Sequence, residues 1–113
     1  MNRTDDNAWS PVCAIADILP DTGVCALVND RHVAVFRIKG RGEVYAIDNF
    51  DPNSMASVLS RGLVGNVGER IVVASPIYKH HFDLRSGECL EAPENSVAAY
   101  PVRVVNDTVL VAV

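Results

Sequence analysis

Short apolar stretches recur along the 113-residue chain and are separated by Gly, Pro, Asn and Asp. In several of them, the side chains would alternate between the two faces of a strand. Amphipathic segments of normal helical length are missing from the pattern. Many short strands bounded by turn residues are typical of an all-β, antiparallel sandwich or barrel, and we expect about nine strands. They are predicted at residues 9–13, 23–28, 32–38, 43–48, 69–74, 82–84, 97–105 and 108–113, with a short hairpin return at 89–90.

Two prolines refine the positions of these strands. Proline lacks the N–H that a strand donates to its neighbour, so it is confined to edges, strand ends and bends. Pro11 therefore marks the first strand as an edge strand. Pro101 indicates that the long strand at 97–105 either lies at an edge or bends.

Helical signals are weak. Residues 14–19 could form one turn before a proline. In the less regular region that follows the fourth strand, residues 54–61 could form another turn, capped by Asn53 or Ser54 and ended by Gly62.

Composition and charge describe one globular domain. Hydrophobic residues make up 49% of the chain and the net charge is −4, without a basic stripe of the kind that binds nucleic acid. The longest apolar run, residues 109–113, is far shorter than the roughly 20 residues of a membrane-spanning helix. The polar residues 1–8 are predicted to be a flexible N-terminus without the apolar core of a secretory signal, and residues 9–113 to form the β domain. We expect a cytoplasmic location.

The three cysteines, Cys13, Cys25 and Cys89, are odd in number and do not share metal-ligand spacing. Cys13 and Cys25 fall at apolar phases of predicted strands. We expect them to be buried, reduced thiols that pack as small hydrophobic side chains.

The stretch from Ala74 to Leu84 carries the strongest functional signal. An apolar strand ends at Ser75 and a proline, and a polar tip of Tyr-Lys-His-His follows at 78–81 before the alternation resumes. Two of the three histidines lie on this tip. Loops held by a rigid scaffold carry much of the binding chemistry of proteins, so this loop is the first candidate site.

Two strand-ending loops, Asn-Phe-Asp-Pro-Asn at 49–53 and Ala-Ser-Pro-Ile-Tyr at 74–78, resemble the two cluster-binding loops of the Rieske ferredoxin family. That family carries Cys-x-His in the first loop and Cys-x-x-His in the second, and clamps a [2Fe–2S] cluster between them. The sequence around the two loops also resembles the family, at residues 46–49, 59–62, 81–88 and 100–104. The resemblance implies a Rieske-like fold, with a small subdomain that holds both loops.

The four ligand positions of the family are occupied here by Asp51, Asn53, Ser75 and Tyr78. None of them is a thiolate or an imidazole, and hard oxygen donors do not replace soft sulfur ligands on iron–sulfur units. The resemblance therefore implies a Rieske-like domain without its cluster, and hence a chain without metal-binding or cofactor-binding residues.

Within this family, the chain resembles the cluster-free small subunits of the cytoplasmic NAD(P)H-dependent nitrite reductases. The similar segments are 17–28, 49–52, 57–63 and 74–76. This resemblance implies a non-catalytic accessory subunit that supports the assimilatory reduction of nitrite to ammonium. The large subunit would be its partner and would carry FAD, a [4Fe–4S] cluster and sirohaem. Catalytic residues are not expected in this chain.

Contact with that partner is expected at the exposed tip of the two loops. The candidate contact residues are Asp51, Asn53, Tyr78, Lys79, His80 and His81. Simpler interpretations stay open: a turn-capping carboxylate for Asp51, and solvated side chains for the two histidines. Tyr78 is expected to be half-buried and to fill the space that a cluster would occupy.

Two other functions stay open at this point. One is a redox or single-metal module that uses His80 or His81 with Asp51, which would need a third ligand that the sequence does not supply. The other is a plain β interaction domain that binds through the edge near Pro101. A Ser-His-carboxylate triad has no recognisable elbow or spacing in the sequence.

Overall fold

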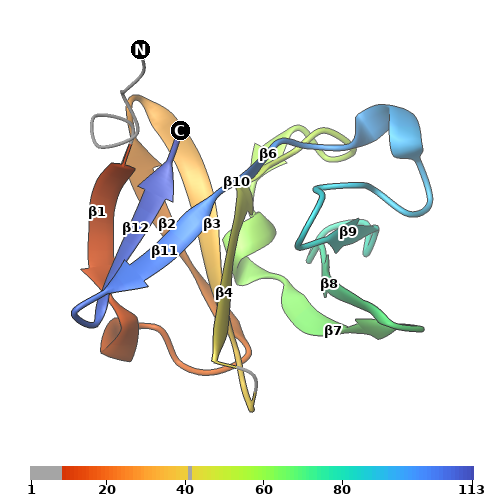
Figure 1. The fold of residues 1–113 in the computed structure, drawn as a ribbon. Coiled ribbons are helices and arrows are strands. Elements are labelled where there is room, and N and C mark those ends of the chain that lie inside the picture. The colour runs from red at the N-terminus through yellow and green to blue at the C-terminus, as the bar shows by residue number, and fades with distance from the viewer. Residues whose placement is uncertain (1–8, 41) are drawn as a thin grey trace.

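The computed structural model describes residues 9–40 and 42–113. The N-terminal segment 1–8, predicted to be flexible, lies outside the described residues. The described part is built almost entirely of strands, with three single-turn 3-10 helices, and none of its helices has the length and hydrophobicity needed to cross a bilayer. The chain forms a barrel-like β-sandwich and a smaller insert beside it (Figure 1).

The sandwich consists of two antiparallel sheets. Sheet A has the strand order β1-β12-β11, and sheet B has the order β10-β4-β3-β2. β1 lies beside β2, and β11 beside β4, which brings the edges of the two sheets together. The strands are β1 (Trp9–Ala14), β2 (Thr22–Val28), β3 (Arg31–Ile38), β4 (Glu43–Asp48), β10 (Ala99–Tyr100), β11 (Val102–Val105) and β12 (Thr108–Ala112), and η1 (Ile15–Asp17) follows β1.

The insert comprises residues 49–98, between β4 and β10, and is the two-loop subdomain that the family resemblance implied. Its main sheet, sheet D, has the order β7-β8-β9, and a two-stranded ribbon pairs β5 with β6. Its elements are β5 (Phe50–Asp51), β6 (Ala56–Ser57), η2 (Leu59–Arg61), β7 (Leu63–Val67), β8 (Arg70–Ala74), β9 (His81–Asp83) and η3 (Pro93–Asn95).

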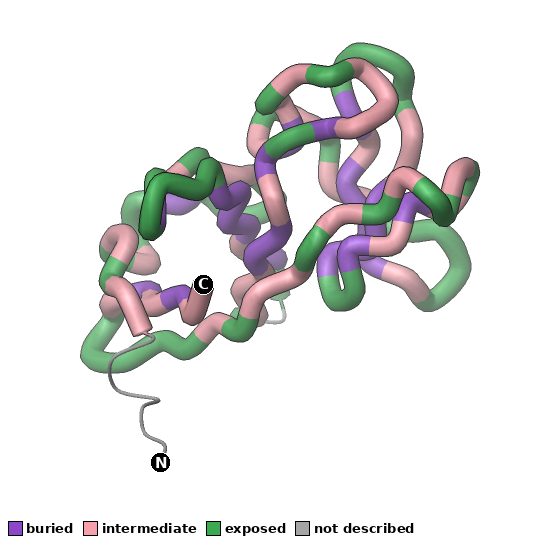
Figure 2. Tube along the Cα trace, turned by 90° about the horizontal axis from the view of Figure 1, so that it is seen from above, coloured by how far each residue is buried: buried purple, intermediate pink, exposed green. Residues whose placement is uncertain are grey.

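β3 separates two hydrophobic cores because its side chains are buried on both faces. Val33 and Val35 point into the sandwich, whereas Ala34 and Phe36 point toward the insert. The sandwich core also contains Ile18, Val28, Ala46, Val109 and Val111. The core under the insert also contains Ile38, Ile47, Leu59, Ile71, Val73, Phe82, Leu84 and Cys89. Figure 2 shows the buried segments running along the inside of both parts.

The prolines have the effects that were predicted. β1 is an edge strand of sheet A, and its register shifts between Pro11 and Cys13. Pro101 divides the predicted strand at 97–105 into β10, which pairs with β4, and β11, which pairs with β12. The bend therefore carries the chain from sheet B to sheet A.

The region after the fourth strand differs from the prediction. The helical turn predicted within 54–61 is present but shorter: residues 56–57 form β6, and Leu59–Arg61 form the turn. Its N-cap is Val58, without a side-chain cap, because Asn53 and Ser54 bond elsewhere. Gly62 does end the turn. β7 was not predicted as a strand.

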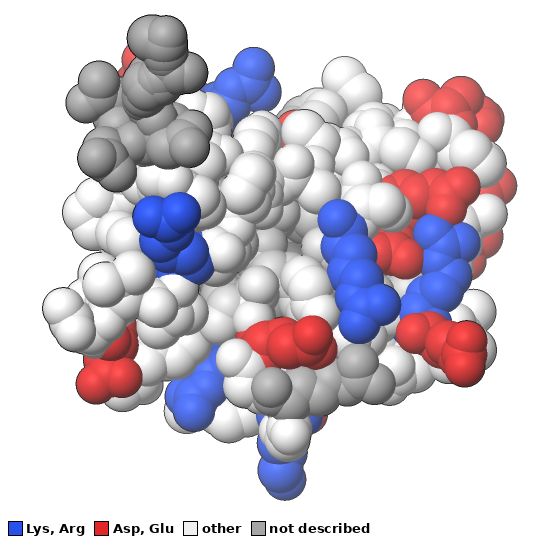
Figure 3. All heavy atoms as spheres, in the orientation of Figure 1, with Lys and Arg blue, Asp and Glu red and all other residues white. Residues whose placement is uncertain are grey.

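On the face seen in Figure 3, basic and acidic side chains lie beside one another over the insert. Within the insert, Arg70 donates to Asp83 at 2.8 Å and also to Glu88.

We predict that Phe36→Ala loosens the insert from the sandwich. Phe36 is fully buried in the core between them, and truncation of such a residue costs about 3–5 kcal/mol. Urea unfolding measures the cost, and hydrogen exchange locates it, with earlier loss of protection in the insert than in β1 and β12. Leu27→Ala, at an exposed position of β2, is the control. A cost below about 1 kcal/mol would contradict the two-core description.

Candidate functional site: the two-loop tip

A hydrogen bond between buried side chains joins the two loops. The Ser75 hydroxyl, at the end of β8, donates to the Asp51 carboxylate, in β5, at 2.5 Å. Asp51 is 0% exposed and Ser75 is 1% exposed. The sequence resemblance aligns these two residues with the two cysteines of the Rieske family. Here the loops are held together by a hydrogen bond between protein side chains.

The Asp51 carboxylate is satisfied from its own loop as well. It accepts the backbone N–H of Asn53 at 2.9 Å and the hydroxyl of Ser54 at 3.0 Å. Burial by itself would raise the pKa of Asp51, but the hydrogen bonds from Ser75, Asn53 and Ser54 outweigh it and hold the pKa below its usual value. The carboxylate therefore stays ionised inside the tip.

Asp51 is consequently not a surface residue, and our expectation that it lies exposed for a partner is wrong. Its side chain turns inward because a buried network of donors stabilises it there. The contacts of Asp51 match the simpler interpretation, a carboxylate that organises a turn. The chain reverses after Asp51, and the N–H of Met55 donates to the Asp51 carbonyl oxygen at 2.7 Å.

Tyr78 also differs from expectation. Its side chain is 62% exposed, so it does not fill the space between the loops. The side chains that link the loops are instead Asp51 and Ser75, with Asn53 bonded to Asp51. Asn53 accepts a hydrogen bond from Asn95 at 2.8 Å, which ties the first loop to η3.

The second loop is a tight turn that presents Lys79. The backbone N–H of Ser75 donates to the His80 carbonyl at 2.9 Å, and the N–H of Lys79 donates to the Ser75 carbonyl at 3.0 Å. Lys79 has a φ of +59°, a left-handed conformation that non-glycine residues rarely adopt. Lys79 and Tyr78 are both exposed at the end of the turn.

The two histidines have different surroundings. His81 begins β9, and its backbone N–H and Nδ1 approach the Glu91 carboxylate at 2.7 and 2.5 Å. Burial would raise the pKa of Glu91, but these hydrogen bonds lower it. His80 is half-buried beside the edge of the Tyr78 ring, and its Nδ1 lacks a hydrogen-bond partner in the described chain. Sequence reasoning missed Glu91, although the predicted hairpin return at 89–90 places it across from the histidines.

The cysteines follow the expectation only in part. Cys89 is buried, Cys13 is half-buried, and Cys25 is exposed. The exposure of Cys25 contradicts our prediction, and its cause is the position of β2 at the edge of sheet B. Burial raises the pKa of Cys13.

The residues at the tip do not fit a [2Fe–2S] cluster. The four family positions offer a carboxylate, an amide, a hydroxyl and a phenol, and the first and third of these are bonded to each other. In residues 9–40 and 42–113, the side chains do not bring together three His, Cys, Asp or Glu groups. The four positions therefore do not offer the donor atoms that iron and sulfide require.

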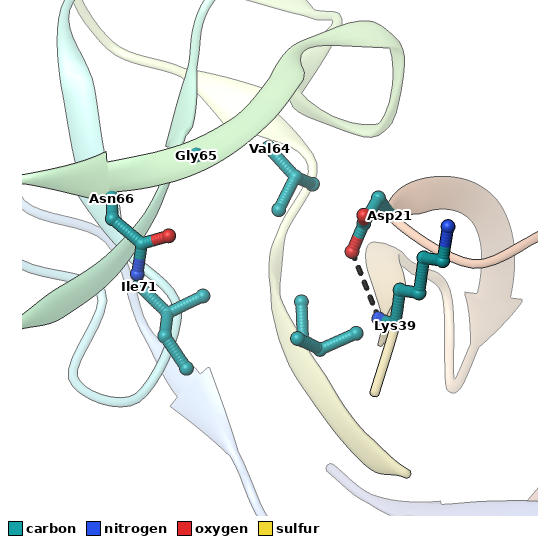
Figure 4. Close-up of a pocket in the computed structure, with 7 residues that line it drawn as sticks. Asp21, Lys39, Val64, Gly65, Asn66 and Ile71 are labelled. Atoms are coloured by element: carbon teal, nitrogen blue, oxygen red, sulfur yellow. Dashed lines mark hydrogen bonds between the residues drawn. The ribbon is translucent and has the colours of Figure 1, made fainter. Parts of the chain in front are cut away.

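Among the hollows of the described surface, two border the insert. The smaller, about 200 Å³, separates β7 and β8 from Asp21 and Lys39 of the sandwich (Figure 4). The Asp21 carboxylate in this hollow already accepts a hydrogen bond from the backbone N–H of Lys39 at 2.8 Å. The larger, about 340 Å³, adjoins the second loop of the tip and is lined by Arg61, Gly62, Leu63, Ala74, Ser75, Pro76, Lys79 and His81.

The fold and the two facing loops are those of a Rieske-like domain, and the model of the Rieske-like [2Fe-2S] domain family matches residues 8–112. The chain belongs to this family.

Within it, the chain is similar to the nitrite reductase (NADH) small subunit of Escherichia coli K12, with 46% identity over 101 residues that cover 89% of this chain and 94% of that one. A crystal structure described as a putative NADH-dependent nitrite reductase small subunit from Mycobacterium tuberculosis superposes with a TM-score of 0.88, at 44% identity, covering 93% of this chain and 94% of that one. A nitrite reductase [NAD(P)H] large subunit of Klebsiella oxytoca is 41% identical over 103 residues, which are 91% of this chain and 11% of that protein.

We predict that the Asp51 network makes the fold sensitive to acid. Because the pKa of Asp51 is lowered on folding, its contribution to stability is present above its unfolded pKa of about 3.9 and is lost as the pH falls through the folded pKa. Asp51→Asn should remove this part of the acid dependence, measured by urea unfolding from neutral to low pH.

Ser75→Ala provides the comparison. This substitution removes the hydrogen bond that lowers the pKa of Asp51 most. It should reduce the acid-dependent part of the free energy of unfolding, and it should cost about 1–3 kcal/mol of stability at neutral pH. If the wild type, Asp51→Asn and Ser75→Ala show the same dependence of unfolding free energy on pH, the Asp51 carboxylate is not ionised as described.

Proposed function

We propose that this chain is a non-catalytic accessory subunit of an NAD(P)H-dependent nitrite reductase and docks onto the large subunit. The large subunit would carry FAD, a [4Fe–4S] cluster and sirohaem and would reduce nitrite to ammonium in the cytoplasm. The observation that carries the proposal is the Asp51–Ser75 hydrogen bond, since it replaces two thiolate ligands by a link between protein side chains. A chain that has lost the donors of its cluster is suited to docking rather than to carrying electrons.

The relatives support this proposal in two ways. Small subunits of nitrite reductases match the chain over nearly their whole length. In Klebsiella oxytoca, a segment similar to this chain is part of a large subunit. Covalent fusion holds a domain beside its partner at high effective concentration, which is consistent with two separate chains that associate elsewhere.

The proposed contact surface is the tip without Asp51. It comprises Asn53, Tyr78, Lys79, His80 and His81. Tyr78 and Lys79 are its exposed members, and an exposed aromatic ring beside a rigid turn is typical of an interface anchor.

The test is nitrite-dependent oxidation of NADH by the large subunit, with and without this chain, together with co-purification of the two. We expect association, and a higher or longer-lasting rate when the chain is present. An unchanged rate together with a failure to associate would overturn the accessory role.

We also predict that the isolated chain, expressed with iron and sulfide available, purifies without a visible iron–sulfur spectrum. The reason is the hard-oxygen donor set at the four ligand positions. Iron and acid-labile sulfide assays measure the content. Stoichiometric iron and sulfide would refute the proposal that the chain lacks a redox centre.

A further inference from the structure

The larger hollow beside the second loop, here called the basic groove, concentrates positive charge in a chain of net charge −4. Arg61, at the end of η2, and Lys79, at the turn, both line it and are exposed. Neither forms a salt bridge with a carboxylate of the described residues. His81 lines the groove as well, with the Glu91 carboxylate bonded to it. Two exposed cations without carboxylate partners in the described part of the chain favour an acidic ligand.

The groove is also bordered by apolar surface. Leu63, at the start of β7, is 76% exposed, and Pro76 is exposed on the facing loop. Its floor depends on Gly62, where a Cβ would lie 2.3 Å from the carbonyl oxygen of Ala74. The close approach of the two segments leaves a hollow lined by both aliphatic and cationic side chains, rather than a flat patch of charge.

Lys79 is held in place at a conformational cost. A left-handed φ is unfavourable for lysine, and asparagine or glycine would adopt it more readily. The turn around it is closed by backbone hydrogen bonds to and from Ser75 and His80, so the ammonium group starts from a fixed backbone. Unfavourable conformations that persist at a binding loop suggest that the side chain is used there.

We propose that the basic groove binds an acidic segment of the large subunit, with its carboxylates paired to Arg61 and Lys79 and an aliphatic side chain packed on Leu63 and Pro76. This inference rests on the proposed function and adds to it the site and the chemistry of the partner. A fused relative supports this choice of occupant, because it places a similar domain beside the large subunit. A segment of mixed acidic and aliphatic character complements both parts of the groove.

Zero-length carbodiimide cross-linking of the assembled complex identifies the contact. The reaction joins an amine to a carboxylate that is already in contact with it, so we expect a covalent product between Lys79 and an Asp or Glu of the large subunit, read by mass spectrometry. Lys79→Asn should lose this product. A complex in which Lys79 cross-links only within its own chain would overturn the proposal.

Affinity measurements with variants form the second part. Arg61→Glu should weaken binding to the large subunit about tenfold or more, and the wild-type affinity should fall with added salt more steeply than that of the variant. Lys79→Asn should weaken binding while the chain keeps its melting temperature or gains a few degrees, because asparagine tolerates the left-handed turn. Arg103→Glu, on β11 of sheet A, makes the same charge change away from the groove and should bind like wild type.

The outcomes separate this inference from the proposed function. If the wild-type chain does not bind the large subunit, the accessory role fails and the groove assignment fails with it. If the wild type binds and both groove variants bind equally well, the accessory role stands and the groove is the wrong surface. Weaker binding by Arg103→Glu to the same extent would show that net charge, and not the groove, controls association.

Discussion

The ionised carboxylate of Asp51 is the constraint on which the tip depends. A charge removed from water is tolerable only when donors surround it, and here Ser75, Asn53 and Ser54 supply them from two separate loops. The donors must come together before the carboxylate can be buried, so one side chain sets the distance between the loops. The link between the two loops is made of hydrogen bonds between protein groups. It also fixes the backbone from which the exposed residues of the second loop extend.

β3 allows the tip to change without loss of the fold. One face of the strand belongs to the sandwich core and the other to the core under the insert, so the insert is anchored by buried apolar side chains such as Phe36 and Phe82. Burial of an aromatic side chain of this size stabilises by about 2–3 kcal/mol. Several such residues hold the insert on sheet B, and the link between the loops adds to this attachment rather than creating it.

Apolar alternation predicted most strands, and Pro11 and Pro101 correctly predicted an edge and a bend. The same pattern failed at β7, where Gly65 contributes no side chain to an alternation. It also could not tell which loop side chains turn inward. Asp51 is buried and Tyr78 is exposed, the reverse of what polarity suggests. The burial of Asp51 depends partly on the Ser75 hydroxyl of the second loop, a donor that is 24 residues away in the sequence. Arg61 was missed for a similar reason, since the close approach of the neighbouring Gly62 to Ala74 of β8 brings it to the site.

The insert leaves and rejoins the sandwich at a single neck. The N–H of Asp48 donates to the Ala98 carbonyl at 3.0 Å, and the Tyr100 hydroxyl donates to the Asp48 carboxylate at 2.5 Å, so the two ends of the insert lie side by side. Because the two ends adjoin, a change inside the insert does not require β4 and β10 to separate. The loops at the tip can therefore vary while the sandwich keeps its architecture.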